Sequence, residues 1–156
     1  MSTPTISVIG LGYIGLPAAA MFASQKVKVI GVDVNEKAVN TINQGKIHIV
    51  EPGLEELVRV AVADGFLRAT TQAEKADAFV IAVPTPFKGD YEPDVSYIEA
   101  VAKAIAPVLE KGNTIILEST SPVGTTDDMI SWLSAARPDL KFPKEGETGQ
   151  DIYVAY

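Results

Sequence analysis

Short apolar runs alternate with longer amphipathic stretches along the whole chain. Six such runs predict strands, at residues 5–9, 27–33, 67–71, 78–83, 113–117 and 152–156. Between them, apolar positions recur at helical spacing and predict helices that begin near residue 13 and cover 35–44, 54–63, 94–111 and 127–136. This alternation predicts an α/β fold, with a mainly parallel sheet and helices on both faces, in one domain over residues 1–156.

Helix caps, prolines and glycines mark the ends of these elements. Asn35 is a candidate helix cap and Gly45 a candidate stop for the helix at 35–44. Two prolines, Pro84 and Pro86, end the strand at 78–83, because proline cannot donate to a strand ladder. Pro107 interrupts the helix at 94–111 and predicts a kink or a new turn there. The polar residues 144–151 predict a flexible loop.

A glycine fingerprint lies between the first two predicted strands. Residues 10–15 read Gly-Leu-Gly-Tyr-Ile-Gly, directly after one strand and at the start of an Ala-rich helix. Asp33 ends the next strand, at the offset of about 20 residues that a dinucleotide-binding turn requires. This context indicates a Rossmann-like, doubly wound sheet that binds a dinucleotide. A structural glycine turn without a ligand is the alternative.

Each position of the fingerprint has an expected role. Gly10 allows the tight turn, Gly12 lets a pyrophosphate approach the backbone, and Gly15 lets the helix lie against the sheet. The helix N-terminus presents unpaired N–H groups and a partial positive charge to the pyrophosphate. Asp33 can accept both ribose hydroxyls and repels a 2′-phosphate, which favours NAD over NADP.

The apolar stretch at residues 6–23 has a second interpretation, as a signal peptide or a membrane helix. No Lys or Arg precedes Lys26, and three glycines and Pro17 interrupt the stretch in the pattern of a strand–helix turn. We therefore expect no membrane insertion, and a cytoplasmic protein.

Composition narrows the partners further. The chain of 156 residues has a net charge of −7, which argues against nucleic acid and anionic membranes and favours small molecules. It contains no cysteine, so thiolate metal sites and thiol nucleophiles are excluded within it. One histidine, His48, cannot form a zinc site alone, and we expect no metal.

Two further loops follow strands whose carboxyl ends should lie near the glycine turn. Thr85 and Thr120 in these loops could place hydroxyl groups near the nicotinamide half of a cofactor. They could equally serve the turns alone, since Thr and Pro are common loop residues. The chain has no Tyr-x-x-x-Lys pair, Gly-x-Ser-x-Gly elbow or Walker lysine loop.

Four ordered motifs resemble those of a known family. Residues 10–17, 51–54, 83–86 and 119–126 are similar to the amino-terminal NAD-binding domain of the UDP-sugar 6-dehydrogenases, the UDP-glucose/GDP-mannose dehydrogenase family. The resemblance covers essentially the whole chain. Within the family, residues 84–90 and 117–120 most resemble members that oxidise UDP-N-acetyl-D-mannosamine.

The resemblance implies a mechanism and a set of site residues. Such enzymes oxidise a sugar C6 alcohol to a carboxylate with two NAD, through an aldehyde and cysteine-bound intermediates. By this resemblance the backbone at Tyr13 and Ile14 holds the pyrophosphate and Asp33 the ribose. Thr85 and Thr126 would line the cofactor, and Thr120 would position a catalytic water.

The family's nucleophilic cysteine, catalytic lysine, asparagine and glutamate have no counterpart here. The expectation is therefore an isolated cofactor domain that binds NAD without turnover. The central region, through which the family forms homodimers, and the carboxyl-terminal domain that binds the UDP-sugar would lie outside it. UDP-glucose or UDP-N-acetylglucosamine as substrate, a stand-alone NAD-sensing module, and a dehydrogenase that works without cysteine are the alternatives.

Overall fold

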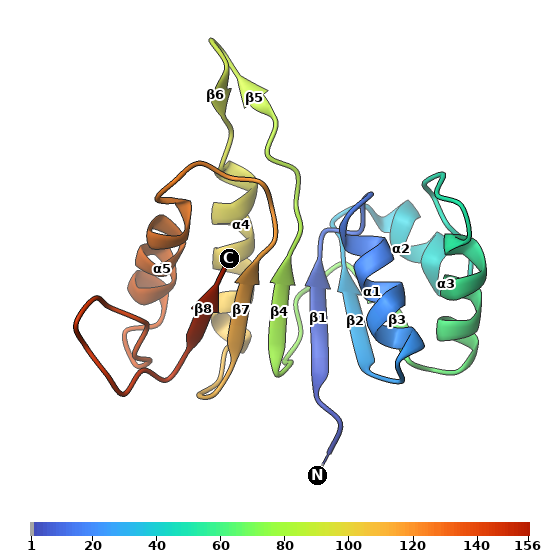
Figure 1. Ribbon diagram of the computed structural model, residues 1–156, viewed down its shortest axis with the longest axis horizontal. Coiled ribbons are helices and arrows are strands. Elements are labelled where there is room, and N and C mark those ends of the chain that lie inside the picture. Colours follow the sequence, from blue (N-terminus) through green and yellow to red (C-terminus); the bar gives the residue numbers. More distant parts are fainter. Residues whose placement is uncertain (1) are drawn as a thin grey trace.

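A computed structural model describes residues 2–156 and confirms the α/β fold. In this part of the chain six parallel strands form one sheet in the order β3-β2-β1-β4-β7-β8 (Figure 1). The strands are β1 (Thr5–Ile9), β2 (Lys28–Val32), β3 (Leu67–Thr70), β4 (Ala78–Ile81), β7 (Thr114–Leu117) and β8 (Tyr153–Ala155). The chain runs outward from β1 to one edge and from β4 to the other. The order therefore reverses between β1 and β4, the position at which doubly wound sheets bind ligands.

Both faces of the sheet carry helices. The helices α1 (Gly15–Ser24), α2 (Glu36–Asn43) and α3 (Leu54–Ala63) pack on one face, around a core that includes Val8. The helices α4 (Ser96–Ile105) and α5 (Thr125–Ala136) pack on the other, around a core that includes Ile9. Successive strand residues point to opposite faces, so neighbours in β1 enter different cores. The predicted doubly wound arrangement is confirmed.

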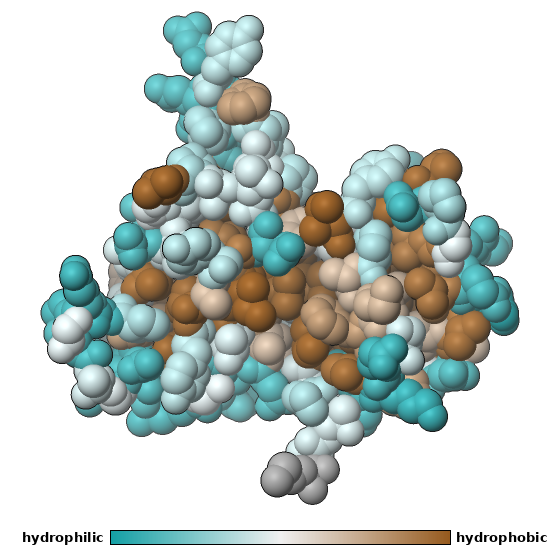
Figure 2. Space-filling model, viewed as in Figure 1, coloured by the Kyte–Doolittle hydropathy of each residue, from teal (hydrophilic) through white to brown (hydrophobic). Residues whose placement is uncertain are grey.

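The first face is only partly covered by helices. Helices α1 to α3 lie over its β1–β3 half, and Figure 2 shows apolar surface beside them, over the β4, β7 and β8 half. Ile116 of β7 belongs to this half and is only half-buried.

The strand register brings the carboxyl ends of the central strands level. Ile9 lies beside Val32 on one side and Ile81 on the other, and Ile81 lies beside Leu117. The loops that follow β1, β2, β4 and β7 therefore meet at one edge of the sheet.

Local signals set the ends of α2 and the interruption of α4 as predicted, whereas the helix expected to reach residue 111 ends at Ile105. The Asn35 side chain caps α2 by accepting hydrogen bonds from the N–H groups of Lys37 and Ala38, at 3.1 and 3.2 Å. Gly45 follows α2 with a φ of +73°, a conformation that other residues rarely adopt. At Pro107 the chain passes from α4 into a short 3-10 helix, η1 (Ala106–Val108), which is the predicted interruption.

A hairpin after β4 was missed by the sequence interpretation. Strands β5 (Phe87–Lys88) and β6 (Glu92–Pro93) pair antiparallel and project from the sheet edge (Figure 1). Two-residue strands are too short to show alternation, so the two prolines after the strand at 78–83 predicted only a rigid loop there. Asp94 then accepts a hydrogen bond from the N–H of Ser96 at 3.0 Å, at the start of α4.

A side chain covers part of the exposed edge of strand β3. The Asn43 amide of α2 donates to the carbonyl oxygen of Ala69 at 2.9 Å and accepts from its N–H at 2.8 Å. These are the bonds that a further strand would make. Asn43 therefore protects β3 from pairing with another chain.

Candidate cofactor site

The turn between β1 and α1 is shaped by two glycines that the protein itself requires. Gly10 has a φ of +93°, and a Cβ there would lie 2.5 Å from the carbonyl oxygen of Ala82. A Cβ on Gly15 would lie 1.6 Å from the carbonyl oxygen of Gly10. Any side chain at either position would displace backbone, so the turn is locked against the loop after β4.

Gly12 is different, because nothing in the protein surrounds it. A Cβ there would meet no atom within 4 Å, and its backbone does not have a positive φ. Neither packing nor conformation demands glycine at this position. The open space beside the backbone is what a pyrophosphate would fill, which fits the expected role of the middle glycine.

The N-terminus of α1 is suited to an anion. Its cap position, Ile14, has no capping side chain, and the N–H groups of Tyr13 and Ile14 have no acceptor within residues 2–156. Among the five α-helices of this part of the chain, α1 alone has no acidic residue in its first turn. Carboxylates that satisfy the other helix dipoles are missing here, so these N–H groups are free for phosphate oxygens.

Asp33 lies beside this turn in a fixed orientation. One carboxylate oxygen accepts from the N–H of Leu11 at 2.9 Å, and the other accepts from the N–H of Asn35 at 2.9 Å. A carboxylate has about four lone-pair positions, so each oxygen can accept a further hydroxyl. The half-buried Asp33 is thus held ready to accept from a diol such as that of ribose.

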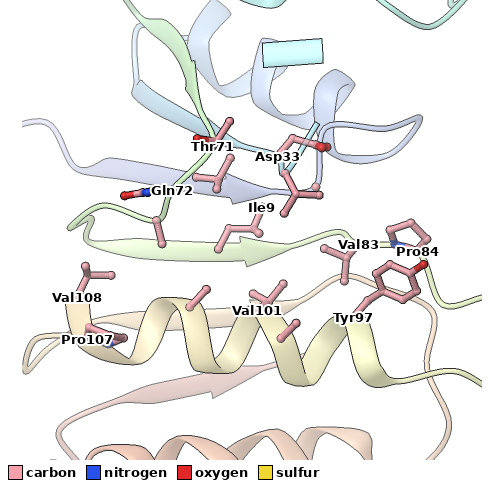
Figure 3. Close-up of a pocket in the computed structure, with 16 residues that line it drawn as sticks. Ile9, Asp33, Thr71, Gln72, Val83, Pro84, Tyr97, Val101, Pro107 and Val108 are labelled. Atoms are coloured by element: carbon pink, nitrogen blue, oxygen red, sulfur yellow. The ribbon is translucent and has the colours of Figure 1, made fainter. Parts of the chain in front are cut away.

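A cavity of about 530 Å³ opens next to Asp33, between the carboxyl ends of β1 and β2, the β3–β4 connection and α4. Figure 3 shows Val83, Pro84 and Tyr97 at one end of it and Pro107 and Val108 at the other. Its walls are mainly apolar, with few polar side chains, as in most small-molecule sites. The volume is enough for the nucleoside half of a dinucleotide.

Thr71, Gln72 and Tyr97 line this cavity and were missed by the sequence interpretation. They come from the β3–β4 connection and from α4, and only the fold brings them close to Asp33. The one available signal was the helical spacing of Tyr97, Ala100 and Ala104, small or aromatic residues on an exposed face of α4.

The loops after β4 and β7 are joined to each other. The Thr85 hydroxyl donates to the carbonyl oxygen of Thr120 at 2.5 Å. The structure therefore brings these two predicted residues together at the sheet edge. Thr126 lies half-buried in the first turn of α5 and shares no hydrogen bond with them in the described chain.

Other functional groups are sparse in the described part of the chain. His48 is exposed in the loop between α2 and α3. Residues 2–156 contain no cluster of His, Asp and Glu that could hold a metal ion. None of the helices in that range has the length and apolarity needed to span a bilayer.

Known proteins are similar to this chain in sequence and in fold. The chain is 64% identical over all 156 residues to the UDP-N-acetyl-D-mannosamine dehydrogenase of Yersinia pestis, and spans 37% of that relative. It is 63% identical over 152 residues, 97% of its length, to the NDP-N-acetyl-D-galactosaminuronic acid dehydrogenase of Ralstonia nicotianae, and covers 36% of it. The UDP-D-ManNAc dehydrogenase structure from Pyrococcus horikoshii superposes with a TM-score of 0.86 at 38% identity, over 96% of this chain and 35% of that one.

A family description matches almost the whole chain as well. Residues 4–156 match the description "UDP-glucose/GDP-mannose dehydrogenase family, NAD binding domain". The glycine turn, the Asp33 carboxylate beside it and the adjoining cavity are compatible with NAD. The chain therefore belongs to the UDP-glucose/GDP-mannose dehydrogenase family, as its NAD-binding domain.

Proposed function

We propose that this chain is the cofactor-binding part of a UDP-sugar 6-dehydrogenase whose substrate is UDP-N-acetyl-D-mannosamine. The reaction converts the C6 alcohol and water to a carboxylate, the uronate, and reduces two NAD. The names of the relatives support this substrate. The Ralstonia relative, of similar identity, is named for a different N-acetylated sugar, so an N-acetylamino sugar is the shared chemistry.

The observation that carries the proposal is the open space at Gly12, between the uncapped N-terminus of α1 and the Asp33 carboxylate. Bound NAD supplies a hydride acceptor. The protein would hold its pyrophosphate with the N–H groups of the turn and its adenosine ribose with Asp33. The residues that we assign to cofactor binding are Gly10, Gly12, Tyr13, Ile14, Gly15, Asp33, Thr85 and Thr126.

Thr120 is the residue that we assign to the chemistry itself. Its carbonyl is held by Thr85, whereas its exposed hydroxyl makes no hydrogen bond within residues 2–156. The hydroxyl is therefore free to donate to a water or to accept from one. This supports a role in orienting a catalytic water beside the substrate.

We further propose that the cysteine nucleophile, the UDP-sugar domain and a dimerising region belong to a longer protein of which this chain is one part. The chain spans about a third of the curated relatives that it matches. Because it contains no cysteine, it cannot form a thioester by itself.

Titration calorimetry of this chain tests the cofactor assignment. We expect NAD to bind and NADP to bind at least about tenfold more weakly, because Asp33 repels a 2′-phosphate. Asp33→Ala should weaken NAD binding and narrow this difference. No binding of NAD, or equal affinities for the two cofactors, would contradict the assignment.

Absorbance of NADH in the presence of each UDP-sugar tests the proposed substrate and the proposed lack of turnover by this chain alone. This chain alone should show no steady NADH production with UDP-N-acetyl-D-mannosamine. The full reading frame that contains it should oxidise this sugar faster than UDP-glucose. Steady turnover by this chain, or a preference for UDP-glucose, would overturn the corresponding assignment.

A further inference from the structure

Ser119 joins the two loops that carry Thr85 and Thr120. Its hydroxyl donates to the carbonyl oxygen of Val83 at 2.9 Å and lies 3.3 Å from that of Ile81. Its own N–H donates to the Ile81 carbonyl at 3.0 Å, beside the N–H of Glu118 at 2.9 Å. The β7 strand thus stays paired with the end of β4 beyond their ladder. Ser119 extends this pairing to Val83, two residues before Thr85.

The same contacts reach the glycine turn. Ala82 precedes Val83, its N–H donates to the carbonyl of Ile9 at 2.8 Å, and its own carbonyl is the group that a Cβ on Gly10 would strike. The three loops at the switch point are therefore one connected unit. Ser119 is the only side chain within residues 2–156 that hydrogen-bonds to the Val83 carbonyl.

The hydrogen bond between the two threonines fixes what Thr85 can offer a ligand. A carbonyl oxygen can only accept, so the Thr85 hydroxyl proton must point to Thr120. The Thr85 oxygen then has only its lone pairs left for a hydrogen bond to a ligand. Toward any bound molecule Thr85 is then an acceptor, which matches a donor such as a ribose hydroxyl or a carboxamide N–H.

We infer that Ser119 is a positioning residue for the nicotinamide end of the cofactor, and that it acts by holding Thr85 as a hydrogen-bond acceptor. The inference rests on the proposed NAD binding. Without the Ser119 hydroxyl, the Val83 carbonyl loses its side-chain partner, and the loop from Val83 to Thr85 keeps only the hydrogen bond between Thr85 and Thr120 to the loop after β7. The adenosine ribose would be bound by Asp33, which neither hydroxyl contacts, and Val83 and Pro84 line only one end of the cavity beside α4.

Calorimetry with NAD and with ADP separates the two ends, because ADP lacks the nicotinamide riboside. We expect Ser119→Ala to lower the affinity for NAD about tenfold, the equivalent of about 1.4 kcal/mol, and the affinity for ADP less than about twofold. Ser119→Thr keeps the hydroxyl and should restore NAD binding. Ser131→Ala is the matched control, because the Ser131 hydroxyl donates to the Asp127 carbonyl at 3.0 Å on the exposed side of α5.

If Ser119→Ala does not fold, a second pair of variants tests the contact on which the inference depends, the Thr85 hydroxyl at the nicotinamide end. Thr85→Val should show the same selective loss of NAD affinity, and Thr85→Ser should retain it. Equal losses of affinity for NAD and ADP, or no loss of affinity in Ser119→Ala or Thr85→Val, would overturn the inference. The proposal that the chain binds NAD would still stand. A wild-type chain that binds neither NAD nor ADP would refute the proposed function, and this inference with it.

Discussion

At the scale of single residues, the three glycines of the turn after β1 are needed for different physical reasons. Gly10 and Gly15 are required because a Cβ at either position would clash with a backbone carbonyl oxygen, whereas Gly12 faces empty space. Protein stability therefore requires glycine at positions 10 and 15, whereas ligand binding requires it at position 12. A turn that served the fold alone would have no use for glycine at position 12.

Alanine substitutions should separate these two constraints. Gly10→Ala should lower the free energy of unfolding by about 2 kcal/mol or more, because a Cβ strikes the Ala82 carbonyl at a strained φ. Gly12→Ala should change it by no more than about 0.5 kcal/mol and weaken NAD binding about tenfold or more. Urea unfolding and calorimetry measure the two effects. Full NAD affinity in a folded Gly12→Ala variant would show that no phosphate approaches this glycine.

At the scale of elements, one carboxylate helps to fix the segment that leads into the last strand, which also pairs with β7. Asp151 accepts from the N–H of Lys141 at 2.9 Å, and its own N–H donates to the Lys141 carbonyl at 2.7 Å. The Lys111 ammonium lies 3.5 Å from the other carboxylate oxygen. The backbone hydrogen bond from Lys141, followed by the charge of Lys111, holds the pKa of Asp151 below the ordinary value of an aspartate.

This lowered pKa predicts how stability depends on pH. Asp151 stabilises the folded chain fully above its unfolded pKa, near 4, and this contribution is lost as the pH falls through the lower, folded value. The wild type should therefore lose more stability between about pH 5 and pH 2 than Asp151→Asn does. Urea unfolding at several pH values measures this. Asp90→Asn, in the exposed hairpin turn, is the matched control and should follow the wild type.

Elements that carry their own signals could be predicted from the sequence. The helix at 54–63 follows from its apolar spacing and the glycines that flank it, and the parallel sheet with helices on both faces follows from the alternation of strands and helices. The β5–β6 hairpin could not be predicted, because a pair of two-residue strands has no pattern of its own. The same holds for the cavity wall, since Thr71 and Tyr97 approach Asp33 only across the folded sheet.

At the scale of the whole molecule, the candidate site bridges the two halves of the sheet. The glycine turn and Asp33 belong to the β1–β3 half, and Thr85 and Thr120 belong to the β4–β8 half. The two halves join where β1 pairs with β4 and where Gly10 touches Ala82. A cofactor bound across this junction would contact both, so its binding would reinforce the contact between them.

The charge of the whole molecule gives a prediction on how the cofactor is held. The chain carries a net charge of −7, and neither the cavity nor the glycine turn contains a Lys or Arg. The pyrophosphate would thus be bound by N–H groups against a repulsive background, which salt screens. The dissociation constant for NAD should therefore stay constant or fall slightly between about 0.05 and 0.5 M NaCl. Calorimetry across this range, with thermal unfolding as a control for folding, measures it. A several-fold loss of affinity with salt would mean that a basic side chain holds the phosphates.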